Sequence, residues 1–118
     1  MDTIKENKRI IAVDFDGVIH EYSQGWWNGS IYDGPVNGAL DALLKLKKNF
    51  DIIIFTTRED HGAIRQWIRI QAEIYLFNTE ELNTLLELPI TNKKPLAFAF
   101  IDDRAIRFTN WKDMLNYF

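Results

Sequence analysis

A short apolar run that ends in two carboxylates constrains the fold of this chain more than any other feature. Residues 10–13 (IIAV) show no polar alternation, which is typical of a strand that is buried on both faces. Asp14, Asp16 and Gly17 come directly after this run. In open α/β sheets, ligands bind outside the carboxyl ends of the strands, so the pattern predicts two acidic groups at a binding edge.

Two later apolar runs, at residues 52–55 and 96–101, also end in polar side chains. The polar residues that flank these two runs are Thr56, Thr57, Arg58, Lys93, Lys94, Asp102, Asp103 and Arg104. Strands that alternate with helices form parallel sheets, in which the carboxyl ends of neighbouring strands share one edge. We therefore expect these groups to gather near the two carboxylates of the first run.

Composition and length limit the class of protein. The 118 residues predict one domain over residues 1–118. A net charge of −3 gives no electrostatic reason to expect broad nucleic-acid binding, and the lack of cysteine excludes disulfides and thiolate metal sites. The polar N-terminus has no signal-peptide core, and no apolar stretch reaches the roughly 18 residues of a membrane span. We expect a cytoplasmic domain that does not bind membranes.

The rest of the chain predicts helices between the strands. A glycine-rich segment at residues 17–34 indicates a loop, and apolar residues at helical spacing predict a helix over 35–48. A second helix is expected from about Asp60 and another around residues 111–118. Residues 74–92 leave several alternatives open: an extension of the second helix, a short strand, a helix with a capping box, and an edge strand.

The side chains at the strand ends meet the requirements of phosphoryl transfer. A carboxylate such as Asp14 can attack phosphorus, provided that a divalent cation cancels its repulsion of the anionic substrate. Oxygen ligands suit Mg²⁺, and Asp14 can meet Asp102 or Asp103 at that ion because neighbouring strands lie about 5 Å apart. Asp16 can protonate the leaving oxygen and later deprotonate water.

Further residues can bind the phosphoryl oxygens. Gly17 permits a sharp turn that brings N–H groups near the phosphate, and Thr56 can donate its hydroxyl. Lys94 or Lys93 can neutralise charge on the transferring group. Each of these residues alone also fits an ordinary role as a cap or a solvated charge. Their joint order at three strand ends favours a site.

These residues together resemble the haloacid dehalogenase superfamily over nearly the whole chain. Its first motif is matched by residues 14–18 (DFDGV), and its second motif by Thr56. Its third motif is matched by Lys94, with Lys93 as the alternative, and its fourth by the two aspartates at 102–103. The resemblance implies a three-layer α/β/α Rossmann-like fold with a mostly parallel central sheet and no cap domain.

The resemblance also implies roles for the acidic residues. Asp14 would be the nucleophile, and the reaction would pass through an aspartyl phosphate. Mg²⁺ would be held by Asp14, the backbone carbonyl of Asp16 and the carboxylate of Asp103, with Asp102 beside them. An aspartate at position 16 distinguishes phosphatases from dehalogenases, so we expect a phosphatase. A phosphomutase and a catalytically silent binding or regulatory module are the alternatives.

The absence of a cap implies an open active site. Thr56 and Lys94 would bind the phosphoryl group in such a site. An open site suits a phosphorylated small molecule, a polymer end or a protein, and another subunit of a homo-oligomer could supply the cover.

Several candidate residues lie outside the four motifs. Trp26, Trp27 and Tyr32 could stack on a ring of the substrate, although we favour the alternative that they fill the core beneath the loop. Arg58 could contact phosphate or pair with a carboxylate. His20 lacks a ligand pattern, so a solvated or capping role is expected. The residues expected to contact substrate are Gly17, Trp26, Trp27, Thr57, Arg58 and Lys93.

Overall fold

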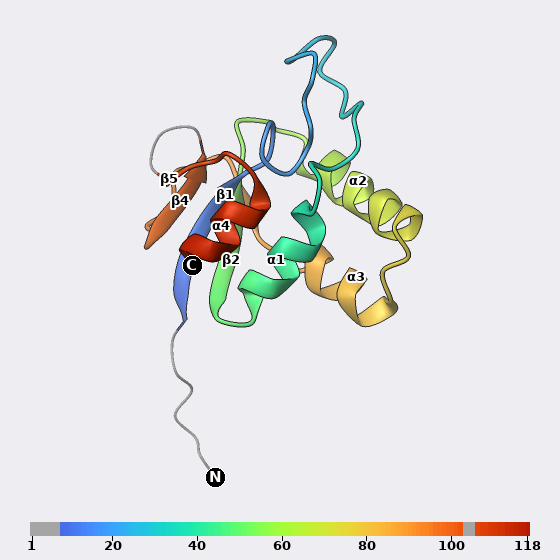
Figure 1. Cartoon of the computed structure of the whole chain (residues 1–118). Helices are drawn as coiled ribbons and strands as arrows, with labels where there is room; N and C mark the ends of the chain where they lie inside the picture. The colour runs from blue at the N-terminus through green and yellow to red at the C-terminus, as the bar shows by residue number, and fades with distance from the viewer. Residues whose placement is uncertain (1–7, 103–105) are drawn as a thin grey trace.

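An all-parallel sheet forms the centre of the chain, and the computed structural model describes it over residues 8–102 and 106–118 (Figure 1). The strands follow the spatial order β3-β2-β1-β4-β5. Their bounds are Arg9–Asp14 (β1), Phe50–Phe55 (β2), Ile90–Thr91 (β3), Ala99–Asp102 (β4) and Ile106–Arg107 (β5). All neighbouring strands pair in parallel, which confirms the predicted α/β class.

Strand β1 lies in the middle of the sheet because its residues tolerate burial on both sides. It pairs with β2 and with β4, so that Val13 lies opposite both Ile54 and Ile101. Ala12, which points to the other face, is 1% exposed. The prediction of a buried strand that delivers Asp14 to the carboxyl edge is confirmed.

The described residues form four helices, and none of them is both long and apolar enough to cross a membrane. Their bounds are Ala39–Lys47 (α1), His61–Ile74 (α2), Thr79–Leu86 (α3) and Trp111–Tyr117 (α4).

Helix α1 starts later than the predicted helix over 35–48. Pro35 forms a bridge with His20 instead, and this pairing keeps the segment before the helix extended. The helix begins after Gly38, which has a φ of 79°. Proline suits the first turn of a helix but also an extended edge, and the tertiary contact with His20 decides between them.

The other helix boundaries agree with the capping signals in the sequence. The Asp60 side chain accepts a hydrogen bond from the Ala63 N–H at 3.0 Å, and α2 starts after it. Asn78 and Glu81 form the expected capping box at the start of α3. The ambiguous residues 74–92 therefore contain the end of α2, the capped helix α3 and the edge strand β3.

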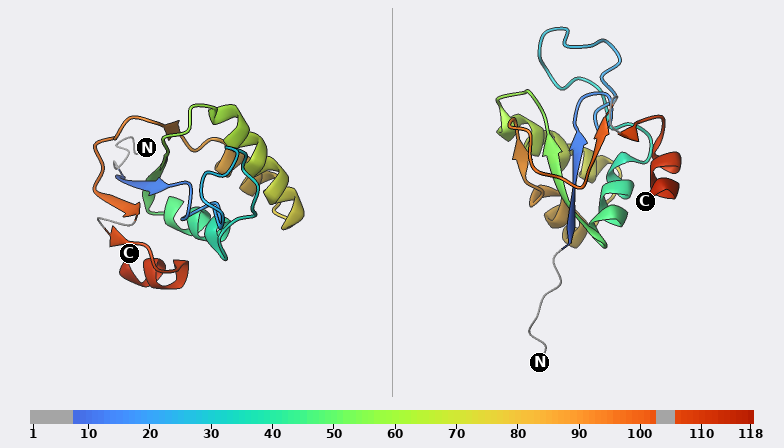
Figure 2. Two further views of the ribbon diagram at one scale, coloured as in Figure 1. Left: turned by 90° about the horizontal axis from the view of Figure 1, so that it is seen from above. Right: turned by 90° about the vertical axis from the view of Figure 1, so that its left-hand side faces the viewer.

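The helices lie on one face of the sheet, whereas the resemblance implies helices on both faces. Figure 2 shows α1, α2 and α3 behind the sheet, while residues 92–98 cross the other face without a helix. Ile52 and Ile54 point toward the helices and are buried, but Ile53 on the opposite face is partly exposed and Phe98 is 55% exposed. The described residues thus form one helical layer, because the short β3–β4 connection holds no helix.

Helix α2 ends at a strained residue that offers a test of the fold. Leu76 has a φ of 62° and is 89% exposed, and the Phe77 N–H donates to the Ala72 carbonyl at 2.9 Å in a Schellman-type end. Leu76→Gly should raise the free energy of unfolding by about 0.5–1 kcal/mol, because relief of strain exceeds the added entropy of the unfolded chain. Leu96→Gly is the control, since Leu96 is 94% exposed without a positive φ, and should be slightly destabilising. Urea denaturation measures both; a destabilised Leu76→Gly would contradict the prediction.

Candidate functional site

The register of the sheet places two carboxylates side by side at its carboxyl edge. Val13 of β1 lies opposite Ile101 of β4, and the next residues of these strands are Asp14 and Asp102. Because side chains alternate along a strand, both aspartates belong to the face that the helices leave open. Neighbouring strands lie about 4.8 Å apart, so the two carboxylates can act on one ligand. Asp103, which was expected to join them, lies outside the described residues, as does Arg104.

This pair of carboxylates fits Mg²⁺ in its chemistry. Mg²⁺ in proteins is commonly held by one or two carboxylates together with water and substrate phosphate. Asp14 and Asp102 supply the two carboxylates from adjacent strands. Within residues 8–102 and 106–118, no group of three or more His, Cys, Asp or Glu side chains could hold a metal ion. The described part of the site therefore supplies two carboxylates, those of Asp14 and Asp102.

Asp16 is held from two sides by Arg58 and His20. Arg58 Nε donates to Asp16 Oδ2 at 2.8 Å, and Arg58 Nη2 donates to Oδ1 at 3.1 Å. His20 Nδ1 lies 2.9 Å from Oδ1. The Arg58 side chain is 6% exposed and that of Asp16 is 18% exposed. Of the two roles considered for Arg58, the structure shows the pairing with a carboxylate.

The hydrogen-bond partners of His20 indicate the tautomer in which Nδ1 carries the proton. The Asp33 backbone N–H points at Nε2 from 3.1 Å, so Nε2 must accept and Nδ1 must donate to Asp16. The ring is fully buried, stacks on Phe15 with a centroid distance of 5.5 Å, and meets the edge of Trp67. The expectation that His20 is solvated or a cap is wrong, because the ring orients Asp16 from within the core.

The turn after β1 explains how the sequence brings His20 back to Asp16. Gly17 has a φ of 83°, a conformation that favours glycine, and its N–H donates to the His20 carbonyl at 2.8 Å. The N–H groups of the next three residues, 18–20, all point at the Phe15 carbonyl. The predicted sharp turn is confirmed, and the Gly17 N–H is bonded within it.

Arg58 also anchors the loop at residues 17–38, which rises above the carboxyl ends of the strands (Figures 1 and 2). Its Nη1 donates to the Gly29 carbonyl at 2.7 Å, and its guanidinium lies 4.8 Å from the centroid of the Trp26 ring. One buried cation therefore joins Asp16 to the middle of the loop.

The two sides of this loop are tied together at Ser23 and Asp33. The hydroxyl and the backbone N–H of Ser23 each donate to its carboxylate at 2.7 Å, and these hydrogen bonds hold the pKa of Asp33 below its usual range. A carboxylate with a depressed pKa stabilises the fold above its unfolded-state pKa, and this contribution is lost as the pH falls through the folded-state pKa. The Ser23–Asp33 tie is therefore intact at neutral pH.

Trp26 and Trp27 are 56% and 62% exposed, so the favoured alternative that they fill the core beneath the loop is wrong. The space beneath the loop is occupied by His20 and by Phe15 and Trp67, whose rings meet edge to face at 5.2 Å. Aromatic content alone could not show this, because the residues that fill the core come from distant segments.

Thr56 follows β2 directly and lies beside the end of β1. It is 5% exposed, and its Oγ1 accepts a hydrogen bond from the Arg58 N–H at 3.1 Å. The hydroxyl proton remains available for donation, so a role toward phosphate is compatible with this geometry. Thr57 is exposed.

Lys94 lies on the open face of the sheet. Its ammonium is 5.0 Å from the centroid of the Phe100 ring, on the strand that ends in Asp102. Lys93 is exposed, and its backbone N–H donates to Thr91 Oγ1 at 3.1 Å. Lys94 thus shares a face with Asp14 and Asp102, whereas Lys93 lies in a polar turn.

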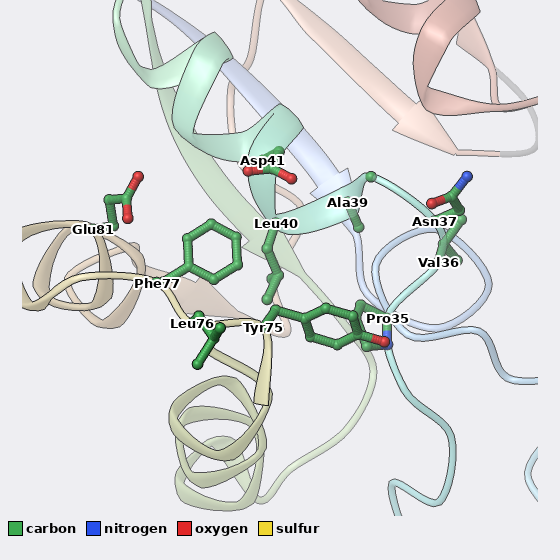
Figure 3. Close-up of a pocket in the computed structure, with 11 residues that line it drawn as sticks. Pro35, Val36, Asn37, Ala39, Leu40, Asp41, Tyr75, Leu76, Phe77 and Glu81 are labelled. Carbon is green, nitrogen blue, oxygen red and sulfur yellow. The ribbon is translucent and has the colours of Figure 1, made fainter. Parts of the chain in front are cut away.

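A separate pocket of about 410 Å³ lies between the start of α1 and the end of α2 (Figure 3). Tyr75, Phe77 and Leu40 form much of its wall, and Asp41 and Glu81 lie at one side. None of the residues at the strand ends lines it, so the candidate chemistry belongs to the sheet edge.

Comparison of the chain with protein-family models, with curated proteins and with solved structures finds no match.

Proposed function

We propose that this chain is a Mg²⁺-dependent phosphohydrolase of the haloacid dehalogenase type, which cleaves a phosphoric monoester through an aspartyl phosphate. The observation that supports the proposal is the position of Asp14 and Asp102, each directly after the paired residues Val13 and Ile101 at the carboxyl edge, together with the oriented carboxyl group of Asp16 two residues after Asp14.

In this proposal Asp14 is the nucleophile. Its carboxylate oxygen attacks phosphorus, and the bond from phosphorus to the leaving oxygen breaks. In this step Asp16 enters in its protonated form, gives its proton to the leaving oxygen and becomes a carboxylate. A water molecule then gives a proton to Asp16 and attacks phosphorus, which releases phosphate and restores both aspartates.

The contacts of Asp16 indicate which of its oxygens moves the proton. A carboxylate has about four acceptor positions. Among the described residues, Oδ1 accepts from both His20 and Arg58, whereas Oδ2 accepts only from Arg58 Nε. Oδ2 is therefore the oxygen that remains open toward the leaving group. His20 cannot supply the proton itself, because the loss of its Nδ1 proton would leave both ring nitrogens without one.

Asp14, Asp102 and Asp103 would hold the metal in this proposal, together with the backbone carbonyl of Asp16. When bound, Mg²⁺ would neutralise charge between the carboxylates and the phosphoryl group. Thr56 would donate its hydroxyl, and the cation of Lys94 on the same face would offset the developing negative charge.

Hydrolysis of p-nitrophenyl phosphate tests the metal requirement. EDTA should abolish the activity and added Mg²⁺ should restore it. Asp103→Asn should raise the Mg²⁺ concentration for half-maximal activity more than Asp102→Asn does, because the resemblance assigns Asp103 to the metal. Mg²⁺ titrations of the two variants measure the difference, and the reverse order would exchange their roles. Activity that survives EDTA would contradict the metal role.

A catalytically silent binding module is the second candidate. It is favoured by the contacts that already engage both oxygens of Asp16. Mg²⁺-dependent phosphate binding without turnover of any phosphomonoester would support this alternative.

A further inference from the structure

The loop above the site presents an exposed aromatic surface with a rigid support. Trp27 is 62% exposed, has a φ of 49° that is unfavourable for a bulky residue, and packs at 5.4 Å on the edge of Tyr32. The Tyr32 hydroxyl accepts from the Gln24 N–H and donates to the Gly25 carbonyl, both at 2.7 Å. A strained backbone that exposes a supported ring is a feature that function commonly retains.

Ring contacts connect this surface to the proposed acid. The Tyr32 ring lies 5.3 Å from the ring of His20, which donates to Asp16. Two ring contacts and one hydrogen bond thus separate Trp27 from Asp16, the residue that would protonate the leaving oxygen. A ring esterified directly to phosphate would lie at Asp16 itself. A ring stacked on Trp27 is separated from Asp16 by Tyr32 and His20, so the substrate needs a spacer between its ring and its phosphate.

The charges around the loop disfavour a polyanionic leaving group. No Lys or Arg occurs between Arg9 and Lys45 in the sequence. A pocket of about 420 Å³ beside Trp26 is bordered by the acidic residues Glu59 and Asp60 and by Arg58. The Arg58 guanidinium is buried and already binds Asp16 and the Gly29 carbonyl. A polyphosphate or a nucleic-acid backbone would therefore find only this engaged cation beside the loop and would be repelled by the two acids.

We propose that the substrates are nucleoside monophosphates whose base stacks on Trp27, an inference that rests on the proposed phosphatase function. The nucleoside leaves as an uncharged alcohol after it takes the proton from Asp16. Phosphate stays on Asp14 until water releases it.

The test compares adenosine 5′-monophosphate with ribose 5-phosphate, which has the same ester but no base. Stacking of one base on an aromatic ring is expected to change affinity by about ten- to a hundredfold, so the wild type should prefer the nucleotide in kcat/KM by at least tenfold. Trp27→Ala should bring the ratio of the two kcat/KM values close to one, mainly through KM. Trp27→Phe keeps a ring and should retain most of the preference.

Tyr117→Ala is the matched control, because Tyr117 is 68% exposed on α4 and takes no part in the site. It should leave both kcat/KM values unchanged. Quenching of tryptophan fluorescence by the nucleotide in Asp14→Asn, and its loss in Asp14→Asn/Trp27→Phe, would show stacking without turnover. Melting curves identify any variant that fails to fold, and Trp27→Phe then carries the test.

The outcomes separate this inference from the proposed function. A wild type without Mg²⁺-dependent hydrolysis of any phosphomonoester overturns the phosphatase. An active wild type with equal kcat/KM for the nucleotide and ribose 5-phosphate overturns the nucleoside assignment alone. A 5′-phosphorylated oligonucleotide that is preferred over the mononucleotide would also overturn it, in favour of a polymer end.

Discussion

Asp14→Asn is expected to abolish turnover while the fold stays intact. The amide has nearly the shape of the carboxylate, but it is a poor nucleophile and a weaker metal ligand. Loss of a nucleophile commonly lowers kcat by several orders of magnitude, so residual activity should fall below about a hundredth of the wild type. Initial rates with p-nitrophenyl phosphate, measured beside circular dichroism spectra, check both parts of the prediction.

Asp51→Asn is a matched control for this change. Asp51 belongs to β2 but lies near the start of that strand, at the opposite end from the carboxyl edge. There it forms a half-exposed ion pair with Lys47 at 3.1 Å. Surface pairs contribute about 0–1 kcal/mol, so its activity and stability should stay close to wild type. An active Asp14→Asn together with an unchanged Asp51→Asn would remove Asp14 from the role of nucleophile.

The strand ends could be predicted from the sequence because each one is a local feature. An apolar run and the polar residue after it are adjacent in the chain, and the parallel pairing of Val13 with Ile101 then places the next residues, Asp14 and Asp102, at the same edge. Capping signals such as Asp60 and the Asn78–Glu81 box are equally local, and they mark the starts of α2 and α3 correctly.

Features that depend on competition between distant segments could not be predicted. The core position beneath the loop is taken by His20 and Trp67, so Trp26 and Trp27 remain outside. Pro35 is drawn into a bridge with His20 and delays α1. A signal for His20 does exist in its spacing of four residues from Asp16, but it has meaning only once the turn at Gly17 is known.

The uncovered face of the sheet could not be predicted from the sequence either. An apolar run such as residues 52–55 indicates burial on both faces, yet Ile53 is only partly buried. The sequence shows that a strand is apolar, but not whether the connection after β3 is long enough to hold a covering helix.

Asp16→Asn is expected to separate the two chemical steps of the proposed reaction. Loss of a general acid and base commonly costs about 10²–10⁴-fold in rate, so hydrolysis of a nucleoside monophosphate should fall in this range. p-Nitrophenolate leaves without a proton. With p-nitrophenyl phosphate the variant should therefore form the aspartyl phosphate and then stall, because no base activates water.

A stopped-flow burst of p-nitrophenolate measures this separation. About one equivalent per chain should be released in a fast phase, followed by slow turnover, whereas a double variant with Asp14→Asn should show no burst. The contacts from Arg58 and His20 are to oxygens, one of which the amide retains, so the loop should stay in place. If both substrates slow equally and no burst occurs, Asp16 instead serves to hold Arg58 and the loop, and the proton must come from another group.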